Sequence, residues 1–206
     1  DYIRKIRDDA NSYFIYSAGL NSNKHGLFNT MADAQNDDTM FDTITYQKGS
    51  AVVHTLREEI GDGAFWKAIN TYLKRHEFAN VETGDLKKVM EEASGQDLSW
   101  FFKQWVYSEG FPKIDVTQSY DRATKSLNLK FVQTHSADKD TPAAFILPLD
   151  LEIRIGNRIL RDRVVLRSRE QNHSVTLDRK PDLLIIDKNS RIPLKLVSLS
   201  ELNFAK

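Results

Sequence analysis

The chain has 206 residues, of which 40% are hydrophobic and 28% charged, so it can bury the core of one large domain or two smaller ones. Basic and acidic residues number 29 each, and this balance gives no bulk charge that would favour nucleic acid or a membrane surface. Cysteine is absent, which excludes disulfides, thiolate metal ligands and cysteine nucleophiles but leaves the compartment open. No apolar run approaches the roughly 18 residues of a membrane span. The start carries neither a signal peptide nor an initiating methionine, so we expect a piece of a longer chain.

The first half of the chain has the apolar spacing of three and four that is typical of helices. This spacing predicts a first helix through Ile3, Ile6, Ala10 and Phe14, followed by an irregular polar stretch over 21–38. Further helices are expected at Val52, Val53, Leu56 and Ile60; at Phe65, Ile69, Tyr72 and Leu73; at Leu86, Val89, Met90 and Ala93; and at Leu98, Phe101, Phe102 and Trp105. We expect Asp62 to cap the helix after it and Gly95 to end a helix in a left-handed conformation.

From Phe111 onwards the period of the apolar residues changes to two. Every odd position in 145–155 is apolar. Further short strands are expected at 126–132, 173–177, 182–186 and 192–199, and turn-prone stretches separate them. Short strands with no helix between them predict an antiparallel β-sandwich. The predicted fold class is therefore α+β in two domains. A helical lobe is expected over 1–110, a β-sandwich over 111–198 and a C-terminal tail over 199–206.

The stretch RHEFAN, Arg75 to Asn80, begins like the zinc-peptidase motif H-E-x-x-H. In that motif two histidines four residues apart on a helix hold the metal, and the glutamate activates water. Asn80 stands where the second histidine is required, and the other histidines show no ligand spacing among themselves. We therefore interpret RHEFAN as a helix end, with His76 near the terminal carbonyls and the negative end of the dipole. No metal ligand is predicted within this chain.

A second candidate is an arginine-rich stretch that carries Arg154, Arg158, Arg161, Arg163, Arg167 and Arg169. Nucleic-acid binding would require aromatic residues between the arginines for base stacking. No aromatic residue occurs between Phe145 and Phe204, so we favour a solvated outer sheet face with edge-protecting charges. Glycine-rich phosphate-binding motifs and the serine-hydrolase motif are also absent. No nucleic-acid partner is expected.

Tyr46 is the third candidate, within FDTITYQKGSAVVHTLREEIG at residues 41–61. It stands just before a predicted helix, and Gly49 in the first turn permits close approach of the backbone to a neighbour. A phenol held at the edge of a cleft can donate a hydrogen bond to an oxyanion. Taken alone, a tyrosine in such a place is more often a packing residue than a catalytic one.

The same stretch resembles the zinc aminopeptidases related to aminopeptidase N and leukotriene hydrolase. The likeness is carried by Phe41, Asp42, Ile44, Tyr46, Lys48 and Gly49, and it continues through LREEIGDGAF, HEFANVETGDL, SGQDLSWFFKQWV and GFPKIDV. It extends more weakly over LKFVQ, FILPLDLEI and PDLLIID, so it covers most of the chain. The order Y-x-K-G, S-G-x-D-L, W and G-x-P is more specific than any one element. The chain departs from the pattern at Ser50, where alanine is commoner.

The resemblance implies the C-terminal half of a thermolysin-like catalytic domain, followed by the family's sandwich domain. In the family the tyrosine of Y-x-K-G, here Tyr46, faces the zinc and stabilises the tetrahedral intermediate. The family's zinc ligands, H-E-x-x-H and a later glutamate, and the G-x-M-E-N stretch that grips the substrate's amino group are absent. Family order places them upstream of Asp1, in N-terminal domains of the same chain. We therefore expect a parent zinc metallopeptidase, an aminopeptidase acting on peptides, and an inactive fragment, because catalytic zinc needs three protein ligands.

Two other interpretations follow from the same residues. The chain could be a non-catalytic scaffold or protein-interaction module derived from such an enzyme, and the sequence upstream of Asp1 would discriminate between them. Carbohydrate binding by the sandwich lacks support, because its strands carry no exposed aromatic platform. A cut through a cleft exposes apolar surface, so self-association of the fragment is expected and can be tested by light scattering. Substrate side-chain preference is left open.

Overall fold

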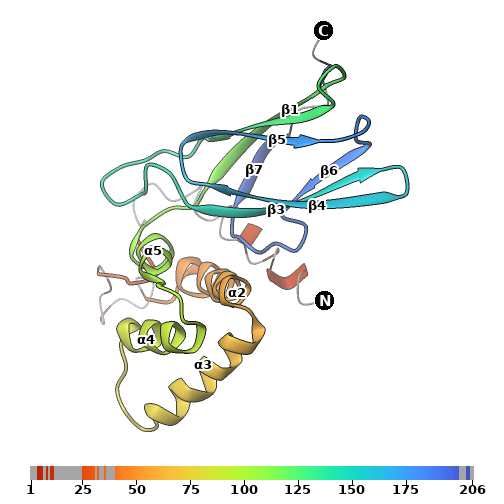
Figure 1. Cartoon of the computed structure of the whole chain (residues 1–206). Helices are drawn as coiled ribbons and strands as arrows, with labels where there is room; N and C mark the ends of the chain where they lie inside the picture. Colours follow the sequence, from red (N-terminus) through yellow and green to blue (C-terminus); the bar gives the residue numbers. More distant parts are fainter. Residues whose placement is uncertain are drawn as a thin grey trace. The chain divides into compact units, whose positions relative to one another are not determined.

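The computed structural model describes residues 4–6, 8, 10–11, 25–30, 32, 35, 40–199 and 203–204. The chain divides into two compact units, residues 1–110 and residues 111–206. The described regular elements of the first unit are helices, and those of the second are strands (Figure 1). The α+β class predicted from the change of period is thus confirmed. Among the described helices, none has the length and apolar character needed to cross a membrane.

The helical unit is built from short helices that follow one another closely in the sequence. Its elements are the π-helical turn η2 (Ile44–Lys48), α2 (Gly49–Ile60), α3 (Asp62–Arg75), α4 (Thr83–Ser94), α5 (Ser99–Phe102) and the π-helical turn η3 (Lys103–Tyr107). An earlier helical stretch includes the buried residues Ile6 and Ala10, as predicted, while Ile3 and Phe14 lie outside the described residues. The described part of 21–38 is irregular, also as predicted.

The core of the helical unit is rich in aromatic side chains. Leu98, Phe101, Phe102 and Trp105 are all buried, which confirms the last predicted helical face. The ring of Phe101 lies 6.0 Å from that of Phe102 and 6.5 Å from that of Trp105, between centroids. Rings at such distances and angles stabilise each other beyond the burial of their area.

Two residues expected to face inward are exposed instead. Val53 on α2 is 49% exposed, and Leu73 on α3 is 64% exposed. The buried positions of these helices include Ala51, Val52 and Leu56 on α2 and Phe65 and Ala68 on α3. Val53 and Leu73 each follow an inward-facing neighbour by one position, and one position rotates a helix by about 100°.

The helix ends follow the predictions in one case and not in another. Gly95 ends α4 with φ of 70°, the left-handed conformation that was expected. Asp62 does not cap α3, because the N-cap residue is Gly61, with φ of 82°. The Asp62 carboxylate instead accepts hydrogen bonds from the guanidinium of Arg57, at 2.6 and 3.0 Å.

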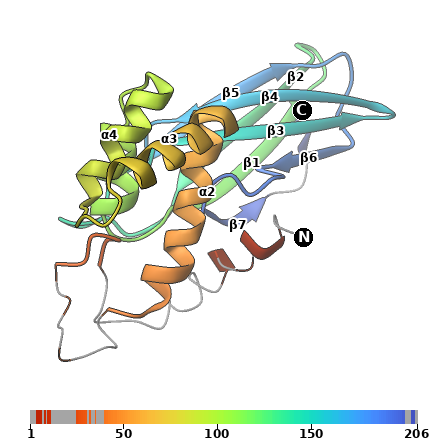
Figure 2. The same cartoon turned by 90° about the horizontal axis from the view of Figure 1, so that it is seen from below.

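The second unit consists of two sheets, drawn as two layers in Figures 1 and 2. Its strands are β1 (Lys113–Asp121), β2 (Ser126–Gln133), β3 (Leu147–Ile155), β4 (Arg158–Leu166), β5 (Glu170–Thr176), β6 (Leu183–Ile186), β7 (Lys195–Leu199) and β8 (Asn203–Phe204). One sheet has the order β5-β2-β1-β7, with β8 also paired to β1, and the other has the order β4-β3-β6. The alternating burial of β1, β2 and β3 gives each sheet a buried face.

The sheets are not wholly antiparallel, in contrast to the prediction. Both β7 and β8 run parallel to β1, whereas β2 pairs with β1 in the antiparallel sense. The physical reason is that β6 belongs to the other sheet, so the chain returns to β1 by a crossing connection and not by a hairpin. Residues 203 and 204, which were expected in a C-terminal tail, pair with Ser119 and Tyr120 of β1.

Candidate active site around Tyr46

Tyr46 lies in the π-helical turn η2, directly before α2. Its side chain is 57% exposed, and its ring stacks on that of Phe41 with centroids 6.5 Å apart and planes 21° apart. Within the described part of the chain, no residue forms a hydrogen bond with the Tyr46 hydroxyl. The phenol is therefore not a core packing group, and its O–H can donate to a group outside the described residues. Its catalytic role stays a prediction.

Asp42 fixes the start of the turn that carries Tyr46. One carboxylate oxygen, Oδ1, accepts the backbone N–H of Thr45 at 2.8 Å, and the backbone carbonyl of Asp42 accepts the N–H of Tyr46 at 3.1 Å. These bonds satisfy backbone donors that the first turn of a helix leaves without a partner. The other carboxylate oxygen, Oδ2, lies 2.8 Å from Nε2 of the buried His25.

Lys48, at the end of the same turn, is buried to 1% exposure. Its ammonium nitrogen lies 3.4 Å from the backbone carbonyl oxygen of Ser108. Burial lowers the pKa of Lys48 to about 8, against the opposing effect of the negative charge on Glu109. Sequence reasoning named Lys48 only as a motif residue and missed its burial. The signal was its spacing, because Lys48 stands four residues after Ile44 and four before Val52, both of which are buried.

The close backbone approach that was expected at Gly49 occurs at Gly26 instead. A Cβ on Gly49 would meet Leu27 at 3.8 Å, an ordinary van der Waals distance. A Cβ on Gly26 would lie 2.7 Å from the carbonyl oxygen of Val106 and 3.0 Å from that of Tyr107. No side chain fits there, so glycine is required where this loop meets η3.

An apolar groove of about 510 Å³ lies beside η2 in the helical unit. Its lining includes Thr45, Gly49, Val53, Val81, Leu86 and Val106. Thr45 on η2 and Gly49 at the start of α2 are in this lining and stand close to Tyr46 in the sequence, whereas Tyr46 is not in the lining. Partial exposure of Val53 and Val81 is explained by their place on this groove.

The described residues contain no group of three or more His, Cys, Asp or Glu side chains that could hold a metal ion. RHEFAN is a helix end, as predicted. The helix α3 ends at Arg75, and the backbone N–H of His76 bonds to the carbonyl oxygen of Tyr72 at 3.1 Å. The His76 ring packs 5.3 Å from the Tyr72 ring. The sequence likeness to H-E-x-x-H therefore has no counterpart in a zinc site here.

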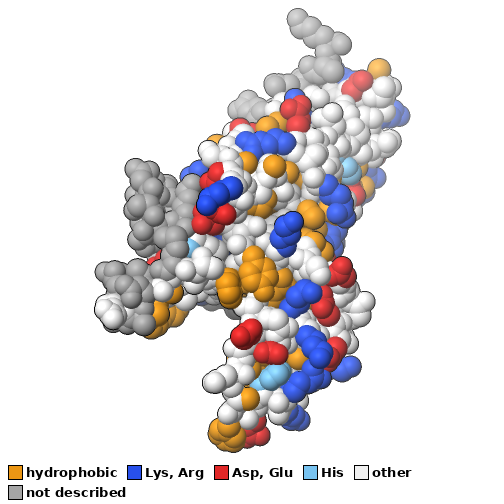
Figure 3. Space-filling model, turned by 90° about the vertical axis from the view of Figure 1, so that its left-hand side faces the viewer, with side chains coloured by type: hydrophobic (Ala, Val, Ile, Leu, Met, Phe, Trp, Pro, Cys, Tyr) orange, Lys and Arg blue, Asp and Glu red, His pale blue; other side chains and the backbone are white. Residues whose placement is uncertain are grey.

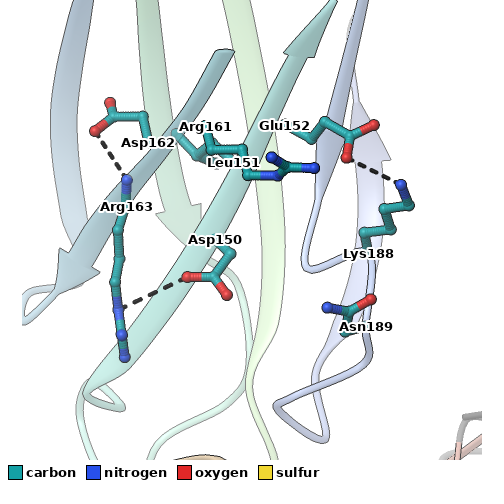
Figure 4. Close-up of a pocket in the computed structure, with 8 residues that line it drawn as sticks. All are labelled: Asp150, Leu151, Glu152, Arg161, Asp162, Arg163, Lys188 and Asn189. Atoms are coloured by element: carbon teal, nitrogen blue, oxygen red, sulfur yellow. Dashed lines mark hydrogen bonds and ion pairs between the residues drawn. The ribbon is translucent and has the colours of Figure 1, made fainter. Parts of the chain in front are cut away.

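The arginine-rich stretch lies on β3, on β4 and after β4, and β4 is an edge strand of its sheet. A charged groove of about 470 Å³ opens beside it, with acidic and basic side chains interleaved (Figure 4). In Figure 4, Lys188 reaches Glu152 at 2.9 Å and Arg163 reaches Asp150 at 3.8 Å. Hydrogen bonds from Lys188 and Arg154 lower the pKa of Glu152. The arginines thus lie on a solvated, edge-protecting face, as the sequence suggested.

Comparison with known proteins identifies the family. Residues 8–105 match the Peptidase family M1 domain. Aminopeptidase N of Lactococcus lactis subsp. lactis is 35% identical over 99 residues, which is 48% of this chain and 12% of that protein. Aminopeptidase N of Streptomyces lividans is 42% identical over 83 residues, 39% of this chain and 10% of that protein. The chain thus spans only about an eighth of the first relative's length.

The fold has a counterpart among solved structures. The crystal structure of Legionella pneumophila aminopeptidase A in complex with aspartic acid superimposes with a TM-score of 0.64 at 17% identity. The match covers 79% of this chain and 18% of the Legionella chain. Because each unit of this chain is smaller than that share, the match includes residues of both. The matched residues 8–105 include the Y-x-K-G and S-G-x-D-L motifs. The resemblance to the zinc aminopeptidases is therefore confirmed, and residues 8–105 of this chain match the Peptidase family M1 domain.

Proposed function

We propose that this chain is part of a zinc-dependent aminopeptidase, which removes N-terminal residues from peptides, and that Tyr46 stabilises the oxyanion of the tetrahedral intermediate. The proposal is supported by the match to the Peptidase family M1 domain and by relatives that bear the name aminopeptidase. Because the chain spans about an eighth of the first relative, the activity is assigned to the longer protein.

The described residues do not fit a zinc site, since no suitable cluster of ligands occurs among them. Catalytic zinc needs three protein ligands and a bound water or substrate. The proposal therefore assigns the metal to residues outside the described part and predicts that the isolated chain is inactive. Metal analysis of the purified chain tests this point, and one tightly bound zinc per chain would contradict it. A full-length protein that bound no zinc and hydrolysed no peptide would favour the scaffold alternative.

The chemistry assigned to Tyr46 follows from its place on η2. Attack on a peptide carbonyl turns the carbonyl oxygen into an oxyanion, and a phenol O–H that is already in position can donate a hydrogen bond to it. The bond strengthens as negative charge develops, so it stabilises the transition state more than the bound substrate. The observation that carries this assignment is the exposed Tyr46 hydroxyl, which no described residue engages, on a turn anchored through Asp42 and Lys48.

The test is Tyr46→Phe in the full-length protein, assayed with a peptide that has a free N-terminus. Loss of one positioned donor should lower kcat by about 10² to 10³ and change KM little. Tyr107→Phe is a matched control, because Tyr107 is similarly exposed at 48% in the same unit, lies outside the motif, and loses only its hydroxyl while the ring against Phe28 is kept. It should keep wild-type turnover. Wild-type turnover in Tyr46→Phe would show that the role assigned to Tyr46 is wrong.

A further inference from the structure

We propose that His25 and Asp42 form the pair that positions Tyr46, an inference that rests on the proposed function of the tyrosine. His25 comes from an irregular segment, and its side chain is 8% exposed, while that of Asp42 is 6% exposed. The pair is thus buried at the start of the turn that carries the exposed phenol. Neither residue touches the reacting atoms in this assignment, because both act through the backbone of η2.

Both ring nitrogens of His25 face hydrogen-bond acceptors. Its Nδ1 lies 2.6 Å from the carbonyl oxygen of Gly26, and its Nε2 lies 2.8 Å from the carboxylate oxygen of Asp42. Both partners are acceptors, so the ring makes both bonds at once only when each nitrogen carries a hydrogen. An imidazolium that faces a carboxylate makes a charge-assisted bond, which is stronger than a neutral one.

Asp42 connects its hydrogen bond with His25 to the backbone of the turn that carries Tyr46. Its second carboxylate oxygen accepts the N–H of Thr45, and its carbonyl oxygen accepts the N–H of Tyr46. Two successive backbone donors of the turn therefore depend on where Asp42 lies. If the His25 bond is lost, the carboxylate is free to rotate and the first turn loses its fixed cap.

The segment that supplies His25 is itself fixed on η3. The backbone of Gly26 packs against the carbonyl groups of Val106 and Tyr107 with no space for a side chain. The N–H of Phe28 bonds to the carbonyl oxygen of Val106 at 3.0 Å, and its ring lies 5.5 Å from that of Tyr107. The segment that supplies His25 is thus held against η3 by these contacts of Gly26 and Phe28.

The far end of the turn is attached to the same part of η3. Lys48 reaches the carbonyl oxygen of Ser108, the residue directly after η3. The turn with Tyr46 is therefore anchored at its start by the His25–Asp42 pair and at its end by Lys48. A misplacement of about 1 Å can cost about 10²-fold in rate, so a loss of the first anchor should appear in kcat.

The first experiment compares Asp42→Ala, Asp42→Asn and His25→Ala in the full-length protein. Asp42→Ala and His25→Ala should lower kcat by about 10-fold to 100-fold with little change in KM. Asp42→Asn should recover most of the loss, because asparagine still caps Thr45 and its amide can donate to the Nε2 of a neutral His25. His173→Ala is the matched control, since it breaks a His–Asp pair of 2.7 Å with Asp162 in the sheet unit. It should leave kcat unchanged.

The second experiment repeats His25→Ala in the Tyr46→Phe background. A pair that acts through the phenol should lower kcat much less there, whereas general damage to the fold would lower it by the same factor in both backgrounds. Equal factors, or full turnover in both Asp42→Ala and His25→Ala, would overturn the inference while Tyr46 kept its role. Full turnover in Tyr46→Phe would overturn the proposed function instead. Should the alanine variants fail to fold, His25→Phe and Asp42→Leu, which fill the space and remove the hydrogen bonds, give the same comparison in the same two backgrounds.

Discussion

The two units of the chain treat their buried polar groups differently. In the sheet unit, the buried Glu152 carboxylate accepts hydrogen bonds from two cations, Lys188 and Arg154, which lower its pKa. In the helical unit, the ammonium of the buried Lys48 lies 3.4 Å from the backbone carbonyl oxygen of Ser108, and burial lowers its pKa. A buried charge costs about several kcal/mol unless it is well paired. The helical unit thus gives up stability where the proposed site lies.

The surfaces of the two units also differ in the side chains that they expose. The sheet unit carries interleaved charges beside β3 and β4 and exposes aliphatic side chains such as Ile159 and Val197, while the helical unit exposes aromatic side chains, among them Phe41, Trp66 and Phe78. Figure 3 shows hydrophobic side chains, drawn in orange, on the surface of the helical unit. Exposed apolar surface of this kind marks contact sites or association. The expected self-association of the fragment stays a prediction.

The largest expected effect is on stability, and it is measured by comparing a phenylalanine of the sheet unit with one of the helical unit. Phe131 on β2 is 1% exposed, so Phe131→Ala removes a full core side chain and should lower the free energy of unfolding by about 3–5 kcal/mol. Phe78 is fully exposed, at 101%, and Phe78→Ala should change stability by less than about 0.5 kcal/mol. Denaturant titrations of the isolated chain measure both. Equal losses would show that Phe78 is covered in solution.

The next effect tests the cost of the buried lysine through its pH dependence. The pKa of Lys48 is about 8 in the folded chain and 10.5 in the unfolded one. Between pH 8 and pH 10.5 the unfolded state binds more protons than the folded state. The free energy of unfolding should therefore rise with pH, by about 3 kcal/mol over this whole range. Below pH 8 both states are protonated, and this contribution is absent.

Lys48→Met removes the titrating group and should remove this rise. The measurement is the difference in unfolding free energy between wild type and Lys48→Met, taken from pH 7.5 to pH 10.5. The comparison cancels the other lysines and the tyrosines, which titrate in the same range in both proteins. A difference that did not change with pH would mean that Lys48 keeps its charge in the folded chain.

Lys48 also shows where sequence reasoning succeeds and where it stops. The periods of three to four and of two predicted the helical and sheet halves, because burial of apolar side chains follows the geometry of each element. The same rule treats every lysine as exposed, so it could not predict that Lys48 shares the buried face of Ile44 and Val52. A pattern of apolar residues carries no information about a charge held inside by particular partners.

Pairings between residues far apart in the sequence could not be predicted from the sequence either. The parallel pairing of β7 with β1 depends on which sheet the chain enters after β6, and strand periodicity is the same for both directions. The bond between His25 and Asp42 joins residues 17 positions apart across an irregular stretch, where no period applies. The resemblance pointed to Tyr46, but the residues around it that fix its backbone became visible only in three dimensions.

The smallest expected effect concerns an ion pair with the same distance as the His25–Asp42 pair but the opposite burial. Arg75 reaches Glu92 at 2.8 Å, with both side chains more than 40% exposed, and its hydrogen bond lowers the pKa of Glu92. Water screens such a pair, and holding two long side chains together costs entropy, so Glu92→Gln should leave the melting temperature unchanged within error. It should also leave kcat of the full-length protein unchanged. If Glu92→Gln slowed turnover as much as His25→Ala does, burial would not be what separates these two pairs, and a positioning role specific to His25 and Asp42 would lose its basis.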